Sequence, residues 1–256
     1  MSWSATQYLA FEQERTRPVR DLLAAVPTAH VGTAVDIGCG PGNSTELLIA
    51  RFPGAQVSAL DSSLDMLAAA RKRLPDVRFE QRAIEAWDDA GPFDVILANA
   101  VLQWLPEHER LFPRLIAKLA QGGSLAVQMP DNLDEPAHVL MREVAAAGPW
   151  ADKLADVVSR RAPRRTPAWY FEALRGACRT LDIWRTTYHH ALPGGGAAVV
   201  EWFKGSGLRP FIAALEGSEQ AAYLARYHEA IARAYPALPD GTVLLPFPRL
   251  FIVATR

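Results

Sequence analysis

The sequence has few of the residues that stabilise secreted proteins or attract polyanions. Only two of its 256 residues are cysteines, Cys39 and Cys178, so no disulfide framework is implied and a reducing compartment fits. The net charge is −1, which gives no electrostatic case for a nucleic-acid partner. No apolar run reaches membrane-spanning length, and no basic start followed by an apolar stretch marks a signal peptide. We therefore expect a soluble, cytoplasmic protein with no membrane or nucleic-acid partner.

Lysine is also scarce, because only four of the 27 basic residues are lysines and the rest are arginines. Codon bias in a GC-rich genome is one explanation. The other is that some of these arginines face a carboxylate-rich ligand, which a guanidinium binds through two parallel hydrogen bonds. The sequence leaves both explanations open.

Short apolar runs alternate with helical patterns through the first half of the chain. Strands are predicted at 33–38, 56–61, 77–84, 93–100 and 123–129, and helices at 43–52, 63–74 and 108–120. This alternation is typical of βαβ units on a parallel sheet, which binds ligands at the carboxyl ends of its strands.

The pattern changes after about residue 131, where long helical stretches replace the alternation. We predict one α/β domain over 1–256, with a seven-stranded, mostly parallel sheet, helices on both faces and an antiparallel last strand. Its parts are a helical segment at 1–30, a cofactor-binding core at 31–130, a helical cap at 131–165 and 193–243, and the last sheet strands at 178–190 and 244–256.

A glycine-rich turn follows the first predicted strand. Gly38, Gly40 and Gly42 are spaced G-x-G-x-G, one residue tighter than the G-x-G-x-x-G of dinucleotide sites. Pro41 removes a backbone N–H that a phosphate would need. Asp36, at the end of the strand, repels a pyrophosphate and suits a ligand with an ammonium or sulfonium group. The turn therefore favours a nucleoside without phosphate.

Polar residues also end two other predicted strands. Asp61 ends the second strand, where a carboxylate can bind both hydroxyls of a ribose. This position does not separate NAD from other nucleosides. Asn99 ends the fourth strand and reaches the same edge of the sheet. Together with the glycine turn and Asp36, Asp61 favours a cationic nucleoside without phosphate, which S-adenosylmethionine fits, with S-adenosylhomocysteine as its product.

At this point the sequence resembles a known family. "VDIGCGPGNST" at 35–45 and "ALDSSLDML" at 59–67 are similar to the first two motifs of class I S-adenosylmethionine-dependent methyltransferases. Later stretches, among them 93–115 and 247–254, resemble the more particular motifs of bacterial enzymes that methylate small polycarboxylic acids. The resemblance extends from about 8 to 255. It implies a Rossmann-like fold, S-adenosylmethionine as the cofactor and a carboxyl O-methyltransferase activity.

The resemblance also implies a set of cofactor-binding residues. These are Tyr8, Arg17, Asp36, Gly38, Gly40, Gly42, Asp61, Ser62, Ala83, Ile84 and Asn99. In the family the third strand usually ends in Ala-Asp-Ile, with the Asp on the adenine amino group. Here Arg82-Ala83-Ile84 stands in its place, so backbone groups would edge the adenine.

The amino-terminal stretch "QYLAFEQERTRP" suggests a helix. Tyr8, Phe11 and Arg15 fall at helical spacing, and Arg17 follows just before a proline. The resemblance implies that this segment lies across the cofactor, with an aromatic ring over it and an arginine near the methionine carboxylate. The sequence does not decide between Arg15 and Arg17.

A carboxylate that accepts a methyl group is already ionised at neutral pH, since its pKa is about 4. We therefore expect no general base, and instead cations, amides and aromatic rings that align the substrate and exclude water. The candidates for substrate binding are Gln103, Trp104, Gln128, His138, Arg142, Tyr188 and Arg249.

Several of these candidates have a plainer interpretation. Trp104 also suits core packing, since "VLQWL" reads as the start of an amphipathic helix. His138 and Arg142, four residues apart on one predicted helix face, are either a solvated stripe or a carboxylate clamp. Arg249 lies in an otherwise apolar strand, where a charge needs a reason.

Other functions stay open at this stage. His189 and His190 have no third metal ligand at a suitable spacing, so we expect no metal. A methyltransferase for another small or carrier-bound carboxylic acid would share every cofactor feature. A nicotinamide-dependent oxidoreductase and a non-catalytic nucleoside sensor are the remaining alternatives. The oligomeric state is not readable from the sequence.

Overall fold

The computed structural model describes the backbone of residues 12–159 and 165–256, with side chains from residue 16 onward in those ranges. The predicted site residue Tyr8 lies outside the described residues. The chain divides into two compact units. Unit 1 comprises Met1–Pro130, Arg165–Thr186 and Leu250–Arg256, and unit 2 comprises Asp131–Arg164 and Thr187–Arg249.

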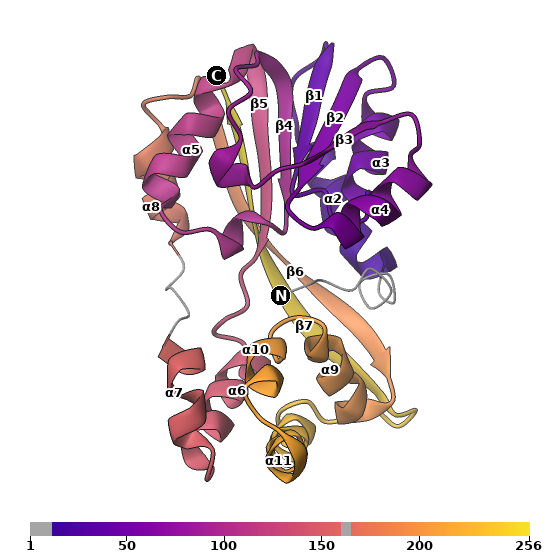
Figure 1. Cartoon of the computed structure of the whole chain (residues 1–256), viewed down its shortest axis with the longest axis vertical. Coiled ribbons are helices and arrows are strands. Elements are labelled where there is room, and N and C mark those ends of the chain that lie inside the picture. Colours follow the sequence, from indigo (N-terminus) through magenta and orange to yellow (C-terminus); the bar gives the residue numbers. More distant parts are fainter. Residues whose placement is uncertain (1–11, 160–164) are drawn as a thin grey trace. The chain divides into compact units, whose positions relative to one another are not determined.

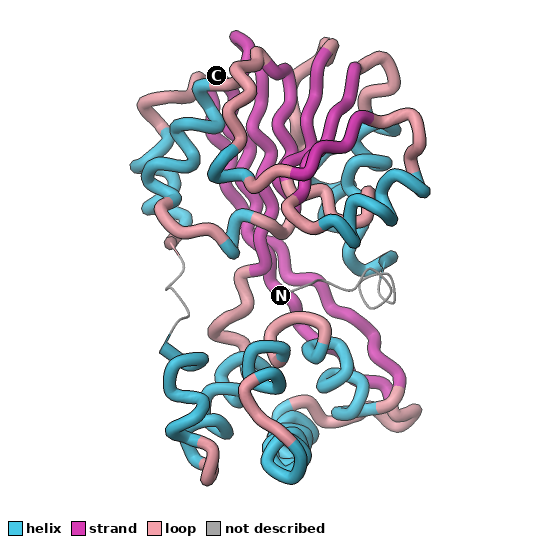
Figure 2. Tube along the Cα trace, viewed as in Figure 1, coloured by secondary structure: helices cyan, strands magenta, loops and turns pink. Residues whose placement is uncertain are grey.

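Seven strands form one sheet (Figures 1 and 2). They are β1 (Thr33–Ile37), β2 (Gln56–Asp61), β3 (Arg78–Gln81), β4 (Phe93–Asn99), β5 (Leu119–Pro130), β6 (Thr180–Pro193) and β7 (Thr242–Thr255), in the order β3-β2-β1-β4-β5-β7-β6. Strands β1 to β5 pair in parallel. The chain leaves β1 toward β2 on one side and later returns to β4 on the other, so the carboxyl ends of β1 and β4 form a topological switch point.

The last strand runs antiparallel to β5. Gly122 donates its N–H to the carbonyl of Arg256, and Asp131 donates its N–H to the carbonyl of Pro248. Residue numbers therefore fall along β7 as they rise along β5, which is the antiparallel arrangement. The predicted seven-stranded, mostly parallel sheet with an antiparallel last strand is therefore confirmed. The boundary between the units falls inside β6 and β7, so each unit holds part of both strands.

Helices flank the sheet in unit 1, with α3 and α4 on one side and α5 and α8 on the other in Figure 1. The α-helices are α2 (Glu12–Ala24), α3 (Asn43–Arg51), α4 (Leu64–Arg73), α5 (His108–Ala117) and α8 (Pro167–Leu174), and the short 3₁₀ helices are η1 (Ile84–Ala86) and η2 (Leu102–Trp104). Helix α8 was not among the helices predicted from the sequence. Its start has a clear signal, because the Thr166 hydroxyl accepts the Trp169 N–H and Pro167 occupies the first helical position.

Several predicted elements have other bounds. The predicted helix at 108–120 ends at Ala117, because β5 begins at Leu119 rather than at 123. Two further departures concern the segments that follow β3 and β4. The third strand was predicted to extend to residue 84, but it ends at Gln81 and a turn leads into η1. The amphipathic pattern after β4 forms only the single 3₁₀ turn of η2 rather than the start of an α-helix. Both departures fall at the carboxyl edge of the sheet, where loops replace regular elements.

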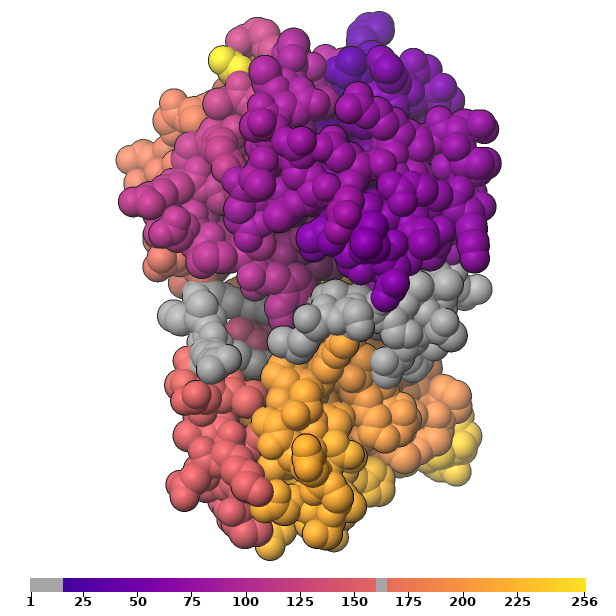
Figure 3. Space-filling view, in the orientation of Figure 1, coloured from indigo at the N-terminus to yellow at the C-terminus, as the bar shows by residue number. Residues whose placement is uncertain are grey.

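Unit 2 contains five described helices, and residues coloured from red through orange to yellow form the face of it that Figure 3 presents. They are α6 (Pro136–Ala147), α7 (Ala151–Ser159), α9 (Gly195–Lys204), α10 (Arg209–Ala213) and α11 (Gly217–Ala234). Two buried tyrosines join α11 to α6, since Tyr223 donates its hydroxyl to the Met141 carbonyl and Tyr227 to the Ala137 carbonyl. That these helices act as a cap stays a prediction. None of the described helices is long and apolar enough to cross a membrane.

The turn after β1 packs closely against the residues that follow β4. Gly38 has φ +76°, and a Cβ there would lie 2.4 Å from Cγ2 of Val101. Gly40 has φ +55°, but a Cβ there would meet nothing within 4 Å. Both positions have a positive φ that favours glycine. At position 38 a glycine is also required because the two loops approach too closely for a side chain.

We expect Gly38→Ala to lower the free energy of unfolding by about 2–4 kcal/mol, since strain in the left-handed region and overpacking against Val101 add. Gly40→Ala is the matched control, with the same backbone strain and no clash, and should cost about 1–2 kcal/mol. Urea denaturation of both variants measures the difference. Equal losses would contradict the close contact with Val101.

Candidate active site

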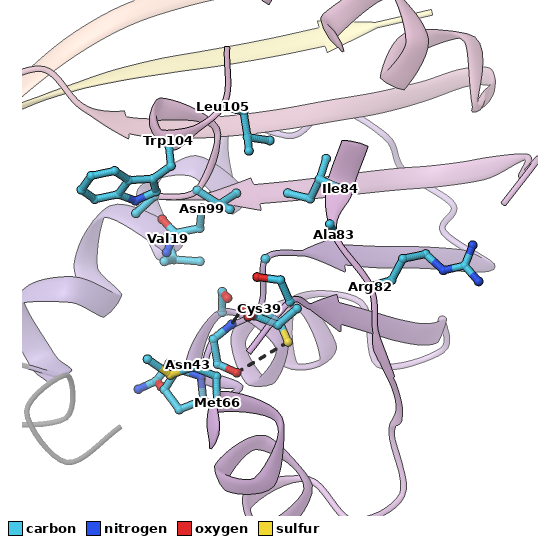
Figure 4. A pocket seen from close by; sticks show the side chains of 18 of the residues that line it. Val19, Cys39, Asn43, Met66, Arg82, Ala83, Ile84, Asn99, Trp104 and Leu105 are labelled. Atoms are coloured by element: carbon cyan, nitrogen blue, oxygen red, sulfur yellow. Dashed lines mark hydrogen bonds between the residues drawn. The ribbon is translucent and has the colours of Figure 1, made fainter. Parts of the chain in front are cut away.

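A cavity of about 290 Å³ lies in unit 1, where the loops after β1, β2, β3 and β4 meet (Figure 4). This is the switch point at which open parallel sheets bind ligands. The residues that line it are Thr16, Val19, Gly38, Cys39, Gly40, Pro41, Asn43, Ser44, Asp61, Ser62, Met66, Arg82, Ala83, Ile84, Glu85, Asn99, Ala100, Val101, Trp104 and Leu105.

Two of the three glycines after β1 line the cavity, and the third allows close helix packing. Gly38 and Gly40 line the cavity, and Gly40 donates its N–H to Oδ2 of Asp61 at 2.9 Å. Gly42 does not line it. A Cβ on Gly42 would lie 3.3 Å from Cα of Ala70, so this glycine lets α3 pack closely on α4. The loop thus offers the cavity a bare backbone surface at two positions.

Asp61 links the loops after β1 and β2. Its Oδ2 accepts the Gly40 N–H, and its Oδ1 accepts the Ser63 N–H at 2.8 Å. An ionised carboxylate can accept about four hydrogen bonds, so two positions remain for a ligand. Within the described residues no lysine, arginine or histidine forms an ion pair with Asp61. The geometry fits two ribose hydroxyls.

Asp36 lies below the cavity rather than on its wall. It is fully buried, and its Oδ2 accepts the hydroxyls of Ser44 and Thr45, each at 2.7 Å. Its Oδ1 has no hydrogen-bond partner within the described part of the chain. Burial raises the pKa of Asp36 to about 6, the negative charge of Asp61 adds to the rise, and the two hydroxyls oppose it. Asp36 therefore places negative potential beneath the glycine loop.

The loop after β3 forms another wall through Ala83, Ile84 and Glu85. Arg114 fixes its path by donating to the carbonyls of Ile84 and Glu85, both at 2.7 Å. The guanidinium of Arg82 pairs with two acidic side chains, those of Glu80 and Asp88, and turns away from the other labelled residues in Figure 4. Ala83 has no side-chain hydrogen-bond acceptor, so this wall offers a ligand the N–H and carbonyl groups of the backbone instead.

The last residue of β4 and the residues after it form the remaining wall. Asn99 lines the cavity, and its buried Oδ1 has no hydrogen-bond partner among the described residues. Trp104 also lines the cavity with 57% of its surface exposed, so the core-packing interpretation was wrong. Gln103 does not line it and donates its side-chain amide to the Ala100 carbonyl at 2.7 Å. Gln128 is fully buried in β5, and its backbone carbonyl accepts the Ala100 N–H.

The amino-terminal helix reaches the cavity through residues that the sequence analysis missed. Thr16 and Val19 line it, three residues apart on one face of α2. Arg17 lies on the same helix but is exposed and does not line the cavity. The helical spacing of Thr16 and Val19 was the available signal, and neither residue type draws attention as a ligand.

The other substrate candidates lie in unit 2. His138 is buried on α6 with its ring edge-on to Phe203, at 5.0 Å between centroids, so it is not part of a solvated stripe. Arg142, one turn later and half-buried, donates to the Leu133 carbonyl at 3.0 Å. That bond ties the helix to the loop after β5.

Tyr188 and Arg249 are also buried in unit 2, at 3% and 4% exposure. The guanidinium carbon of Arg249 lies 4.9 Å from the centre of the Phe247 ring, which in turn packs against His190 and Trp202. A guanidinium is seldom found this deep without a specific role. The structure thus divides the substrate candidates between two units, with Gln103, Trp104 and Gln128 in unit 1.

The cavity fits a cationic nucleoside without phosphate. Arg82 is the one lysine or arginine among its described lining residues, and two carboxylates already bind its guanidinium. Asp61 and the buried Asp36 contribute negative charge instead. Within the described residues no group of three histidine, cysteine or acidic side chains could hold a metal, and the expectation of metal-free chemistry stays a prediction.

Replacing Asp61 tests the ribose site. Asp61→Ala removes a charge-assisted acceptor, so we expect binding of S-adenosylhomocysteine to weaken by about 1.5–3 kcal/mol in calorimetric titrations. Asp65→Ala is the control, because Asp65 is exposed on α4 and carries the same charge. Affinity unchanged within about a factor of two in Asp61→Ala would rule out this role.

The raised pKa of Asp36 makes folding stability depend on pH. Below about pH 4 the carboxyl is protonated in both states, while between about pH 4 and 6 only the unfolded chain ionises it. Ionisation therefore removes about 3 kcal/mol of stability as the pH rises through that window. Asp36→Asn lacks this loss, so its stability relative to wild type should rise by about that amount from pH 4 to 7 in urea denaturation. A pH-independent difference would contradict the buried charge.

Comparisons with known proteins agree with this geometry. A family model described as a methyltransferase domain matches residues 34–123. YcgJ of Bacillus subtilis has a similar structure, with a TM-score of 0.60, 12% identity and coverage of 94% of this chain and 98% of that one. Phosphoethanolamine N-methyltransferase 2 of Haemonchus contortus, solved with S-adenosyl-L-methionine, aligns at a TM-score of 0.53 and 17% identity, over 93% of this chain and 52% of its own. At these identities the likeness concerns the fold alone.

Sequence similarity is much closer to a set of curated bacterial enzymes. Trans-aconitate 2-methyltransferase of Rhizobium meliloti (strain 1021) is 56% identical over 256 residues, which is all of this chain and 99% of that protein. The protein of the same name from Methylobacterium nodulans is 56% identical over 99% of this chain and 98% of its own. Identity at this level extends through both compact units. The chain belongs to the trans-aconitate 2-methyltransferase family, whose members are S-adenosylmethionine-dependent methyltransferases of class I.

Proposed function

We propose that this enzyme transfers a methyl group from S-adenosylmethionine to one carboxylate of trans-aconitate and forms a methyl ester. The observation that carries this proposal is the 56% identity to relatives of that name along the whole chain, unit 2 included. The negative charges at the cavity in unit 1 independently support S-adenosylmethionine as the methyl donor. A cytoplasmic location, expected from the sequence, stays a prediction.

Each wall of the cavity has a part in holding the cofactor. Asp61 accepts the ribose hydroxyls, and the backbone at Ala83 and Ile84 edges the adenine. Gly38 and Gly40 allow close approach to the backbone. When bound, the cofactor supplies a methyl group on a positively charged sulfur, which is open to in-line displacement. The negative charges of Asp36 and Asp61 favour that cation over a phosphate ester.

The residues after β4 complete the reacting end. Asn99 presents an amide oxygen without a described partner, and Trp104 presents an exposed indole. A substrate carboxylate is ionised at neutral pH, so the site needs no general base. Its task is to align the carboxylate and exclude water, and we assign the exclusion of water to Trp104.

The carboxylates that are not methylated also leave water and need donors there. We assign this recognition to Arg142 and Arg249, with His138 and Tyr188 as further candidates and Arg17 as a third arginine. A guanidinium suits a carboxylate because it donates two parallel hydrogen bonds. The low exposure of Arg249 supports this role, because desolvation strengthens a charge-assisted hydrogen bond.

A methyl-transfer assay against a panel of acids tests the proposal. The purified chain is incubated with radiolabelled S-adenosylmethionine and trans-aconitate, saturated tricarballylate or the monocarboxylate crotonate, and the esters are identified by mass spectrometry. We expect the highest kcat/KM with trans-aconitate and a large loss with crotonate, because remote carboxylates supply orienting energy. Equal turnover of mono- and tricarboxylic acids would favour an enzyme for another small or carrier-bound acid.

Arginine-to-lysine variants test the substrate clamp. Arg142→Lys, Arg249→Lys and Arg17→Lys keep the charge but lose the paired hydrogen bonds. At a true clamp position KM for trans-aconitate should rise by about tenfold or more, which is about 1.4 kcal/mol, while affinity for S-adenosylhomocysteine stays nearly constant. Arg233→Lys, exposed on α11, is the control. Wild-type kinetics in all three variants would refute the clamp.

A further inference from the structure

The segment after β4 has a strained backbone at both ends. Ala100 has φ 52° and Glu107 has φ 57°, and these are the two residues other than glycine with left-handed backbone among those that the structure describes. Such conformations cost free energy and persist when surrounding contacts impose them. Between them lies η2, which ends at the cavity-lining Trp104. The contacts that hold this segment therefore decide where Trp104 lies.

Ala100 is held from both sides. Its N–H donates to the Gln128 carbonyl at 2.8 Å, and its carbonyl accepts the side-chain amide of Gln103 at 2.7 Å. These bonds fix the start of the segment on β5. The turn itself is held by the fully buried side chain of Leu102 and by the bond from the Leu105 N–H to the Leu102 carbonyl.

His108, the first residue of α5, adds a side-chain contact to the same carbonyl. Its Nε2 lies 2.8 Å from the Leu102 carbonyl, and its Nδ1 lies 2.7 Å from the hydroxyl of Tyr170 on α8. A carbonyl can only accept, so Nε2 carries the proton. In a neutral ring Nδ1 is then the acceptor, and the Tyr170 hydroxyl is the donor. Burial lowers the pKa of His108, which favours this neutral form.

Tyr170 is itself firmly placed. It is 2% exposed, and its ring packs against Phe112 and Trp169, each at 5.1 Å between centroids. Its hydroxyl therefore has a fixed position relative to α5. By donating to Nδ1 it selects the tautomer in which His108 can donate to Leu102. A chain of two hydrogen bonds thus runs from α8 to the turn that carries Trp104.

We propose that His108 and Tyr170 are positioning residues for methyl transfer, which hold the turn Leu102–Trp104 so that the Trp104 indole covers the reacting end of the cavity. The inference rests on the proposed function for its kinetic consequence, while the hold on the turn is a structural claim of its own. Neither residue lines the cavity, so neither is a catalytic residue.

Tyr170→Phe is the sharpest test, since it keeps the ring and removes only the hydroxyl. Without that hydroxyl Nδ1 loses its partner, so the ring is oriented by the Leu102 carbonyl alone and its hold on the turn weakens. We expect kcat with trans-aconitate to fall about tenfold, as for loss of one ordered contact in the transition state. The Kd for S-adenosylhomocysteine should stay within about twofold, because the cofactor's ribose and adenine walls are untouched.

Three further variants separate positioning from general loosening. His108→Phe should match Tyr170→Phe, whereas His108→Gln should restore much of the rate, because its amide offers one donor and one acceptor. Leu174→Val is the structural control, since Leu174 is a fully buried residue of α8 that makes no polar side-chain contact. It should leave kcat close to wild type. A loss in Leu174→Val equal to that in Tyr170→Phe would overturn the proposal.

A readout besides activity uses protein labelled with 5-fluorotryptophan, with the Trp104 resonance assigned by Trp104→Phe. We expect the ¹⁹F line of Trp104 to shift or broaden in Tyr170→Phe and His108→Phe and to stay unchanged in Leu174→Val. An unchanged line in the first two variants would refute the hold on the turn. If trans-aconitate proves not to be a substrate, this spectrum alone decides the structural claim, so the two failures are distinguishable.

Discussion

The site depends on two carboxylates that the chain holds without a described cation to neutralise them. Asp61 is fixed by the N–H groups of Gly40 and Ser63, and Asp36 by the hydroxyls of Ser44 and Thr45. These bonds order the loops after β1 and β2 and the first turn of α3. The same bonds leave net negative charge beside and beneath the cavity. A positively charged ligand therefore completes an electrostatic arrangement that the protein alone leaves unbalanced.

This arrangement trades stability for binding. Burial raises the pKa of Asp36, so its charge at neutral pH costs free energy of folding. The left-handed backbone at the cavity-lining Ala100 and at Glu107 adds a second cost in the segment after β4. Both costs fall at the carboxyl edge of the sheet, whereas the strands behind it carry a core of fully buried aliphatic and aromatic residues. The rigid sheet can therefore support strained loops where the chemistry requires them.

Much of the fold and of the cofactor site was predictable from local patterns. The βαβ rhythm, the tight glycine spacing and Asp61 at a strand end depend on residues near one another in sequence. The sheet confirms the rhythm, and Gly38, Gly40 and Asp61 line the cavity. The misses have a common cause. Whether Asp36 lines the cavity or lies below it, and whether Trp104 is buried or exposed, depends on tertiary packing that no local pattern encodes.

The substrate side shows the same limit more strongly. His138 and Arg142 share a helix face, but only the structure shows that His138 is buried against Phe203. Thr16 and Val19 line the cavity although neither is a typical ligand-binding residue, and the role of Tyr170 depends on a contact with His108, 62 positions away. Contacts of this kind arise when α8 and α5 pack together, which propensity and periodicity do not determine.

The central claim is that unpaired carboxylates select a cationic nucleoside and reject phosphate. Calorimetric titration of the purified chain with S-adenosylmethionine, S-adenosylhomocysteine and NAD measures that selection directly. We expect S-adenosylmethionine to bind at least about a hundredfold more tightly than NAD, a difference of about 2.7 kcal/mol, and S-adenosylhomocysteine, which lacks the sulfonium charge, measures what that charge contributes. Binding of NAD as tight as that of S-adenosylmethionine would contradict the account.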